Sequence, residues 1–198
     1  TTATTKSDDD EVLESADGGD DEESRKRTAA ITESFKAPML AAAIASVQLQ
    51  VHPDLKMSDA ALAAMAELLC HFFERIRNAL PSDQPWQLSA EARPITLNAD
   101  RFSKLVQSLL TGELGNHCIH EMEKAMAKDD ASFERNYGLQ FPVKSWAVPC
   151  LALVGTFAPK AAIALAAALE YLTAEVLELG GNEAKRASLL TIEVDQME

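Results

Sequence analysis

The sequence predicts an all-α protein built from two modules that share one plan, a short helix followed by a long one. From about Ser34 onward the chain is rich in Ala and Leu, and its apolar residues recur at steps of three and four. The alternation typical of strands is nearly absent. A polar, charged stretch at 127–137 divides the chain, and the short-then-long pattern begins again after it.

The N-terminal segment differs from the rest in composition. Residues 1–27 contain ten acidic and four basic side chains and almost nothing that could pack. We therefore expect residues 1–33 to form a disordered acidic tail. Residues 28–198 contain 21 acidic and 14 basic side chains, so the rest of the chain is acidic as well.

The first module is expected to span residues 34–128. A short helix over 37–49 should end before Pro53, which cannot continue it. Ser58 is a suitable N-cap for a long amphipathic helix that runs to Pro81. Asn98 can cap a third helix, and Gly112 separates that helix from a fourth.

The second module is expected to span residues 138–198, after a linker at 129–137. A short segment at 142–155 leads into a second long helix. Its apolar positions Ala162, Leu165, Leu169, Leu172, Val176 and Leu179 step by three and four. Gly180 and Gly181 are expected to end this helix.

Composition excludes several classes of protein. The net charge of −13 disfavours a generic DNA-binding surface. The three cysteines are widely spaced among apolar neighbours, which indicates reduced thiols in an intracellular compartment rather than a disulfide scaffold. No apolar run approaches the ~20 residues of a membrane-spanning helix, so we expect no membrane contact. We find no nucleophile elbow, phosphate-binding glycine loop or paired carboxylates, and predict neither an enzyme nor a cofactor.

One group of residues could be considered as a metal site. His117, Cys118, His120 and Glu121 are close in sequence, with Cys70 and His71 as further possible ligands. Their spacing is not that of a zinc motif. Packing is the preferred interpretation, and no metal is predicted.

Several motifs resemble those of core histones. Residues 138–143 (GLQFPV), 169–179 (LEYLTAEVLEL) and 181–182 (GN) look like histone two-A. Residues 51–54 (VHPD), 73–76 (FERI) and 112–114 (GEL) with His117 look like histone two-B. The chain thus resembles a histone doublet, a two-B fold fused to a two-A fold, as is known from giant viruses. The resemblance implies two histone folds paired in a handshake, the second truncated at its third helix.

The resemblance also implies a structural chromatin protein that packages DNA. Its expected partners are double-stranded DNA, bound weakly and with strong salt dependence, and histones three and four or their viral doublet. The expected location is the host nucleus, a viral factory or the virion. The surviving candidates for DNA contact are Lys36, Lys56, Arg93, Thr96, Lys144 and Lys160.

The family's acidic patch is also represented. Glu170, Glu175 and Glu178 lie within about 140° of each other on a helix at 100° per residue, and Glu113 and Glu121 share one side of the fourth helix. These five carboxylates match family positions that receive basic peptides, because an Arg side chain binds a carboxylate through two charge-assisted hydrogen bonds. Without the resemblance, they would be interpreted as a solvated helix face.

Two alternatives stay open. An acidic histone mimic or chaperone-like module would bind basic histones or readers of the acidic patch without wrapping DNA, and the net charge favours it. A generic helical scaffold with accidental similarity would not require its halves to pair, so cutting the linker at Asp129 separates it from the histone interpretation.

Overall fold

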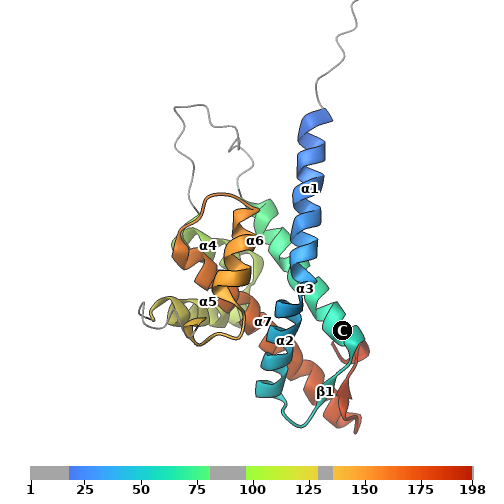
Figure 1. The fold of residues 1–198 in the computed structure, drawn as a ribbon. Helices are drawn as coiled ribbons and strands as arrows, with labels where there is room; N and C mark the ends of the chain where they lie inside the picture. The colour runs from blue at the N-terminus through green and yellow to red at the C-terminus, as the bar shows by residue number, and fades with distance from the viewer. Residues whose placement is uncertain (1–17, 81–96, 129–135, 198) are drawn as a thin grey trace, which may run out of the picture.

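The computed structural model describes residues 18–80, 97–128 and 136–197. Within these ranges the fold is all-α, with two very short strands, as the sequence predicts (Figure 1). Residues 1–17 of the expected tail lie outside the described residues. The rest of that expectation is wrong, because helix α1 (Gly18–Phe35) occupies residues 18–33. Ile31 and Phe35 are buried, and this packing outweighs the polar composition of the helix.

The first module forms four helices where local signals predict them. Helix α2 (Pro38–Val51) is followed by α3 (Asp59–Ala79), α4 (Ala99–Leu109) and α5 (Gly112–Met126). Ser58 Oγ accepts a hydrogen bond from Ala61 N at 3.2 Å and caps α3. Asn98 Oδ1 accepts from Arg101 N at 2.9 Å and caps α4 in the same way. Both caps satisfy backbone donors that a helix start leaves unpaired.

The second module starts with a tightly bonded turn. The Asn136 side chain accepts from Val143 N at 2.9 Å and donates to the carbonyls of Leu139 and Phe141, both at 2.8 Å. The 3₁₀ turn η2 (Asn136–Gly138) is followed by a π-helical turn, η3 (Val143–Ala147), and the short helix α6 (Val148–Ala152). Residues 136 and 137 of the expected linker are thus folded against the second module, while 129–135 lie outside the described residues.

The long helix of the second module is longer than predicted. Helix α7 (Pro159–Arg186) passes through Gly180 and Gly181 without ending. The physical reason is a close approach: a Cβ atom at Gly181 would lie only 2.8 Å from His52 Cγ. The glycine therefore makes room for a neighbour, although glycine costs a helix about 1 kcal/mol relative to Ala.

Helix α7 is the centre of the fold. It contacts α2, α3, α4, α5 and α6, and residues 161–169 are buried on every face. A helix that is apolar all round is buried all round, which explains the run of alanines and leucines there. The buried core continues through Met65 and Leu69 on α3 and Cys118 and Met122 on α5, so it joins both modules.

The two modules meet at both ends of their long helices. Strands β1 (Lys56–Met57) and β2 (Thr191–Ile192) pair in parallel, so the loop before α3 lies beside the segment after α7. A parallel bridge between Leu97 and Phe157 joins the reciprocal pair of loops. Each module thus places its first loop against the second loop of the other. This reciprocal arrangement is the handshake of two histone folds within one chain.

Helix α1 adds a third connection between the modules. The indole Nε1 of Trp146 donates to Ser34 O at 3.0 Å, and the rings of Phe35 and Trp146 form an edge-to-face pair with centroids 5.1 Å apart. Phe35 also packs against Phe73 of α3, at 5.7 Å between centroids. The C-terminal part of α1 therefore packs between α3 and the start of the second module.

Candidate functional site

The structure distributes the basic candidates over three places. Lys36 follows α1 and Lys144 lies in η3, near the Ser34 to Trp146 contact. Lys56 lies in β1 at one end of α7, whereas Lys160 lies at the N-terminus of α7, at the other end. All four side chains are exposed. The 28 residues of α7 span about 42 Å at 1.5 Å per residue, so these lysines form no single cluster.

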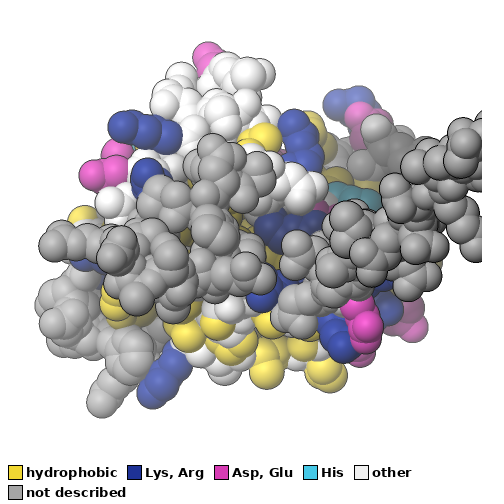
Figure 2. Space-filling view, turned by 90° about the horizontal axis from the view of Figure 1, so that it is seen from above, with side chains coloured by type: hydrophobic (Ala, Val, Ile, Leu, Met, Phe, Trp, Pro, Cys, Tyr) yellow, Lys and Arg dark blue, Asp and Glu magenta, His cyan; other side chains and the backbone are white. Residues whose placement is uncertain are grey.

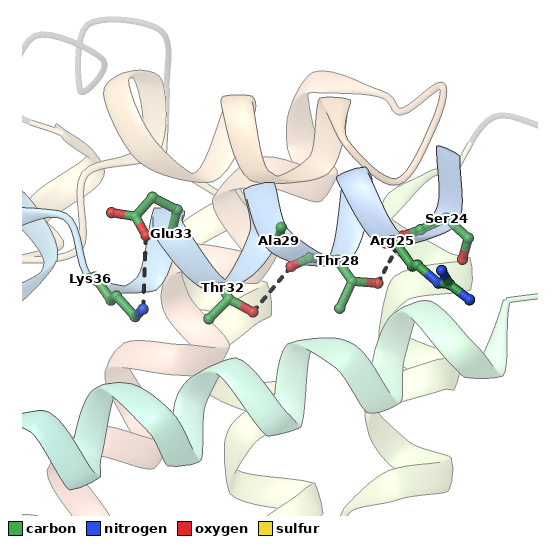
Figure 3. Close-up of a pocket in the computed structure, with 7 residues that line it drawn as sticks. All are labelled: Ser24, Arg25, Thr28, Ala29, Thr32, Glu33 and Lys36. Atoms are coloured by element: carbon green, nitrogen blue, oxygen red, sulfur yellow. Dashed lines mark hydrogen bonds and ion pairs between the residues drawn. The ribbon is translucent and has the colours of Figure 1, made fainter. Parts of the chain in front are cut away.

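The surroundings of these lysines are mixed in charge. Figure 2 shows Lys and Arg side chains in separate groups, several of them beside Asp or Glu. Lys36 Nζ lies 3.8 Å from the Glu33 carboxylate at the C-terminal end of α1 (Figure 3), and both side chains are exposed. An exposed pair of this kind contributes little stability and leaves the lysine able to exchange partners. Arg93 and Thr96 lie outside the described residues.

The Lys56 end of α7 is the least suited to phosphate. Lys56 N donates to Leu190 O at 2.9 Å, so the lysine lies beside an exposed leucine. Leu190 is 76% exposed, so an apolar side chain at the surface borders this lysine. Nearby, Lys185 Nζ pairs with the Asp54 carboxylate at 3.0 Å, and this pairing lowers the pKa of Asp54.

The five acidic candidates lie on two helices that pack together. Glu113 and Glu121 belong to α5, and Glu170, Glu175 and Glu178 belong to α7, its principal packing partner. Glu113 and Glu178 are exposed, whereas the other three are partly buried. The carboxylates therefore differ in how freely they can meet a partner.

Glu170 is engaged inside the protein. Its Oε2 accepts hydrogen bonds from the backbone N–H groups of Gln140 at 2.5 Å and Phe141 at 2.9 Å. Burial raises the pKa of this carboxyl group, and the two hydrogen bonds offset only part of that effect. Glu170 thus anchors the chain where the second module begins, in addition to any role at the surface.

A cavity of about 310 Å³ lies beside Glu170, between α2, α5 and α7. Val47, Val51 and Leu139 supply part of its apolar lining, and Glu121 and Glu170 supply its carboxylates. Two lysines also line it: Lys124 Nζ pairs with Glu121 at 3.2 Å, and Lys128 Nζ donates to Tyr137 O. Neither lysine belongs to a motif that the sequence singles out. The spacing of Glu121 and Lys124, one turn apart, was the available signal.

Glu175 also has an internal partner. Tyr171 lies one turn before it on α7, and the phenol hydroxyl donates a hydrogen bond to the Glu175 carboxylate. Burial and this carboxylate both raise the pKa of Tyr171, so the phenol stays protonated near neutral pH. Of the five candidates, Glu113 and Glu178 are therefore the ones most available to an outside cation.

The cysteines and histidines considered for metal binding are separated by burial. Cys70 and Cys118 are buried, whereas His71, His117 and His120 are exposed. Burial raises the pKa of the Cys118 thiol to about 12, so it stays protonated. Within residues 18–80, 97–128 and 136–197, no group of three or more His, Cys, Asp or Glu side chains is arranged to hold a metal ion. None of the helices in this part of the chain has both the length and the apolar content of a membrane-spanning segment.

Two histone folds paired within one chain define a histone-doublet-like protein. Comparison with curated proteins points to the same class: the chain is similar to a histone doublet of Melbournevirus that joins histones two-B and two-A, at 25% identity over 154 residues. The match covers 73% of this chain and 55% of that protein, so the chain spans about half the length of the curated relative it matches. No family model matches the sequence.

Proposed function

We propose that the chain is a structural chromatin protein, a fused lateral histone dimer that contributes to a loose nucleosome-like particle. The observation that carries this proposal is the handshake of two histone folds inside one chain, together with the similarity to a histone doublet. Fusion replaces a bimolecular association by an intramolecular one, which supports one-to-one pairing of the two folds. The remaining partners would be DNA and histones three and four or their fused equivalent.

DNA contact is proposed for the exposed lysines. Lys160 combines its charge with the N-terminus of the long helix α7, where unpaired N–H groups and the helix dipole favour phosphate. Lys36 and Lys144 add charge near the place where the modules meet. Each neutralised phosphate adds about 0.9 to the slope of log affinity against log salt, so three to five contacts give weak, salt-sensitive binding. Arg93 and Thr96 stay candidates from sequence alone.

We further propose that the acidic side chains of α5 and α7 bind basic peptides. Glu113 and Glu178 are exposed and available for bidentate contact with Arg. Glu121 is paired with Lys124, so a partner must compete with that lysine. This surface needs no cofactor and no catalytic group, in keeping with a structural protein acting in a nucleus, viral factory or virion.

The net charge supports a second candidate. At −13 the chain repels free DNA on average, and its candidate lysines are dispersed. An acidic histone mimic or chaperone-like module that binds basic histones without wrapping DNA would have these properties.

A salt series distinguishes the two functions. DNA binding is measured from low to physiological salt, with and without a tetramer of histones three and four, followed by nuclease digestion. The dimer function predicts that the tetramer strengthens binding and that a protected DNA fragment appears with all components present. Formation of a DNA-free complex with basic histones, without nuclease protection, would instead establish the second function.

A further inference from the structure

The loop between α2 and β1 holds a buried histidine in a fixed orientation. His52 is 6% exposed and lies at the end of α2. The amide of Gln48, itself buried, donates from Nε2 to the carbonyls of His52 at 2.8 Å and Leu55 at 2.9 Å. These two bonds fold the loop back on α2, so the imidazole points toward the second module.

The imidazole fits into a notch in the second module, which is the space left open beside Gly181. His52 Nε2 lies 3.2 Å from the carbonyl oxygen of Glu178, a hydrogen-bonding distance. The notch exists because residue 181 is glycine: a Cβ there would collide with the ring carbons and nitrogen of His52. At Gly180 a Cβ would meet only tight neighbours at 3.1 to 3.4 Å, from residues near the C-terminus. Gly181 therefore makes room for the imidazole of the first module, whereas Gly180 faces the segment that follows α7.

Among the residues that the structure describes, the opposite end of the handshake has no equivalent contact. Lys56 and Met57 pair with β2, and their counterpart in the second module is Phe157, which pairs with Leu97. His52 precedes Lys56 by four residues and Met57 by five. The residues four and five positions before Phe157 are Leu153 and Ala152, whose side chains form no hydrogen bonds. The imidazole contact thus breaks the approximate symmetry of the pair.

We propose that the contact between His52 and Gly181 is a recognition element that makes the first module pair with the second module rather than with a second copy of itself. In a pair of first modules, the imidazole would meet α3, which contains no glycine. In a pair of second modules, the notch would face Leu153 or Ala152, and the Glu178 carbonyl would lose its contact with the imidazole. The element would also allow pairing in trans, between complementary modules of two copies of this chain.

Pairing specificity is measured on the full chain with a protease site placed within residues 129–135. The folded chain is cut, mixed with a cut copy of different mass, and allowed to exchange. Native mass spectrometry then counts mixed pairs and like pairs. The proposal predicts that pairs of a first and a second module exceed like pairs at least roughly tenfold, since overpacking costs about 1 to 3 kcal/mol.

Substitutions identify the residues responsible. Gly181→Ala should weaken pairing of the cut modules roughly tenfold through collision with the imidazole. Adding His52→Ala to that variant should restore most of the loss. Gly180→Ala is the matched control, because it makes the same change in helix propensity without the collision. His52→Ala alone, which keeps the notch open, should fold and lower the preference for unlike pairs by about fivefold, the loss of one hydrogen bond.

Three results would overturn the proposal: like pairs as frequent as unlike pairs, a Gly181→Ala variant that pairs as well as Gly180→Ala, or no recovery in the double variant. If Gly181→Ala does not fold, the His52→Ala measurement decides alone. None of these results depends on DNA binding, so they leave the proposed chromatin function to its own test.

Discussion

The seam, which is the buried interface between the two modules, is much more complete than the charged outer surface. The seam is continuous, with residues 161–169 of α7 buried in an unbroken run against α2, α3, α4 and α5. The outer lysines are few, dispersed and in part paired with nearby carboxylates. The chain therefore carries a complete surface for pairing its own halves, whereas the lysines proposed for DNA contact are dispersed.

The largest effect is expected from weakening the seam. Leu169→Ala removes a fully buried side chain of α7 and should lower the free energy of unfolding by about 2 to 5 kcal/mol. Denaturant unfolding followed by circular dichroism measures this change. Leu179→Ala on the same helix is the control, because Leu179 is 67% exposed and its loss should have little effect. Equal effects of the two substitutions would contradict the placement of the seam.

Helix α1 should be part of the seam rather than an appendage. Phe35→Ala removes the ring between Phe73 and Trp146 and should cost about 3 to 5 kcal/mol of stability. Trp146 fluorescence should change as well, because its ring loses an edge-to-face partner. Glu33→Ala, on the exposed face of α1, serves as the control. Unchanged stability and fluorescence in Phe35→Ala would show that α1 does not pack there.

Glu170 belongs both to the buried seam and to the acidic candidates of the surface. Two substitutions of Glu170 should therefore separate the effect of its hydrogen bonds from the effect of its charge. Glu170→Ala leaves the N–H groups of Gln140 and Phe141 without their acceptor and should cost about 1 to 3 kcal/mol, measured by urea unfolding. Glu170→Gln keeps an acceptor oxygen and removes the buried charge, so at neutral pH it should be at least as stable as the parent chain.

The pH dependence of stability tests the same residue. Burial raises the folded-state pKa of Glu170 above its unfolded value, so the folded state holds the proton more tightly. This group's contribution to stability therefore falls as pH rises through the interval between the two pKa values. Urea titrations from pH 4 to 7 should show this loss in the parent chain and less of it in Glu170→Gln. An identical pH profile in both proteins would refute the raised pKa.

The smallest effects are expected at the outer lysines. Replacing Lys36, Lys144 and Lys160 by Gln, one at a time, should each lower the slope of log affinity for DNA against log salt by about 0.9 where a phosphate contact is lost. Unfolding should be nearly unchanged, since all three side chains are exposed. Lys124→Gln is the control, because this lysine pairs with Glu121 on the acidic side. Slopes that do not differ from the control would remove these lysines from the DNA surface.

Local signals in the sequence predicted the fold where local contacts decide it. Ser58 and Asn98 cap their helices as predicted, because an N-cap depends on residues within one turn. Local signals do not predict helix α1, since its apolar side is only Ile31 and Phe35, and its packing partners lie far away in the sequence. Gly180 and Gly181 have the local pattern of a helix end, but the reason for glycine at 181 is His52, more than a hundred residues earlier.

The sequence predicts which residues form the candidate surfaces, but it does not predict what surrounds each of them. The helical period placed Glu170, Glu175 and Glu178 on one side of α7. The sequence does not show that Glu170 anchors Gln140 and Phe141, because that contact depends on how the chain folds against α7 after the linker. The apolar neighbours of Lys56 likewise depend on the pairing of β1 with β2.

The handshake itself is tested most directly by nuclear Overhauser effects at both ends of α7, in one uniformly labelled chain. Cross-peaks are expected between Met57 and Ile192 and between Leu97 and Phe157. Both sets should persist when labelled chains are diluted into unlabelled ones, because the contacts lie within one molecule. Absence of either set, with the helices still formed, would contradict a pair of histone folds clasped in a single chain.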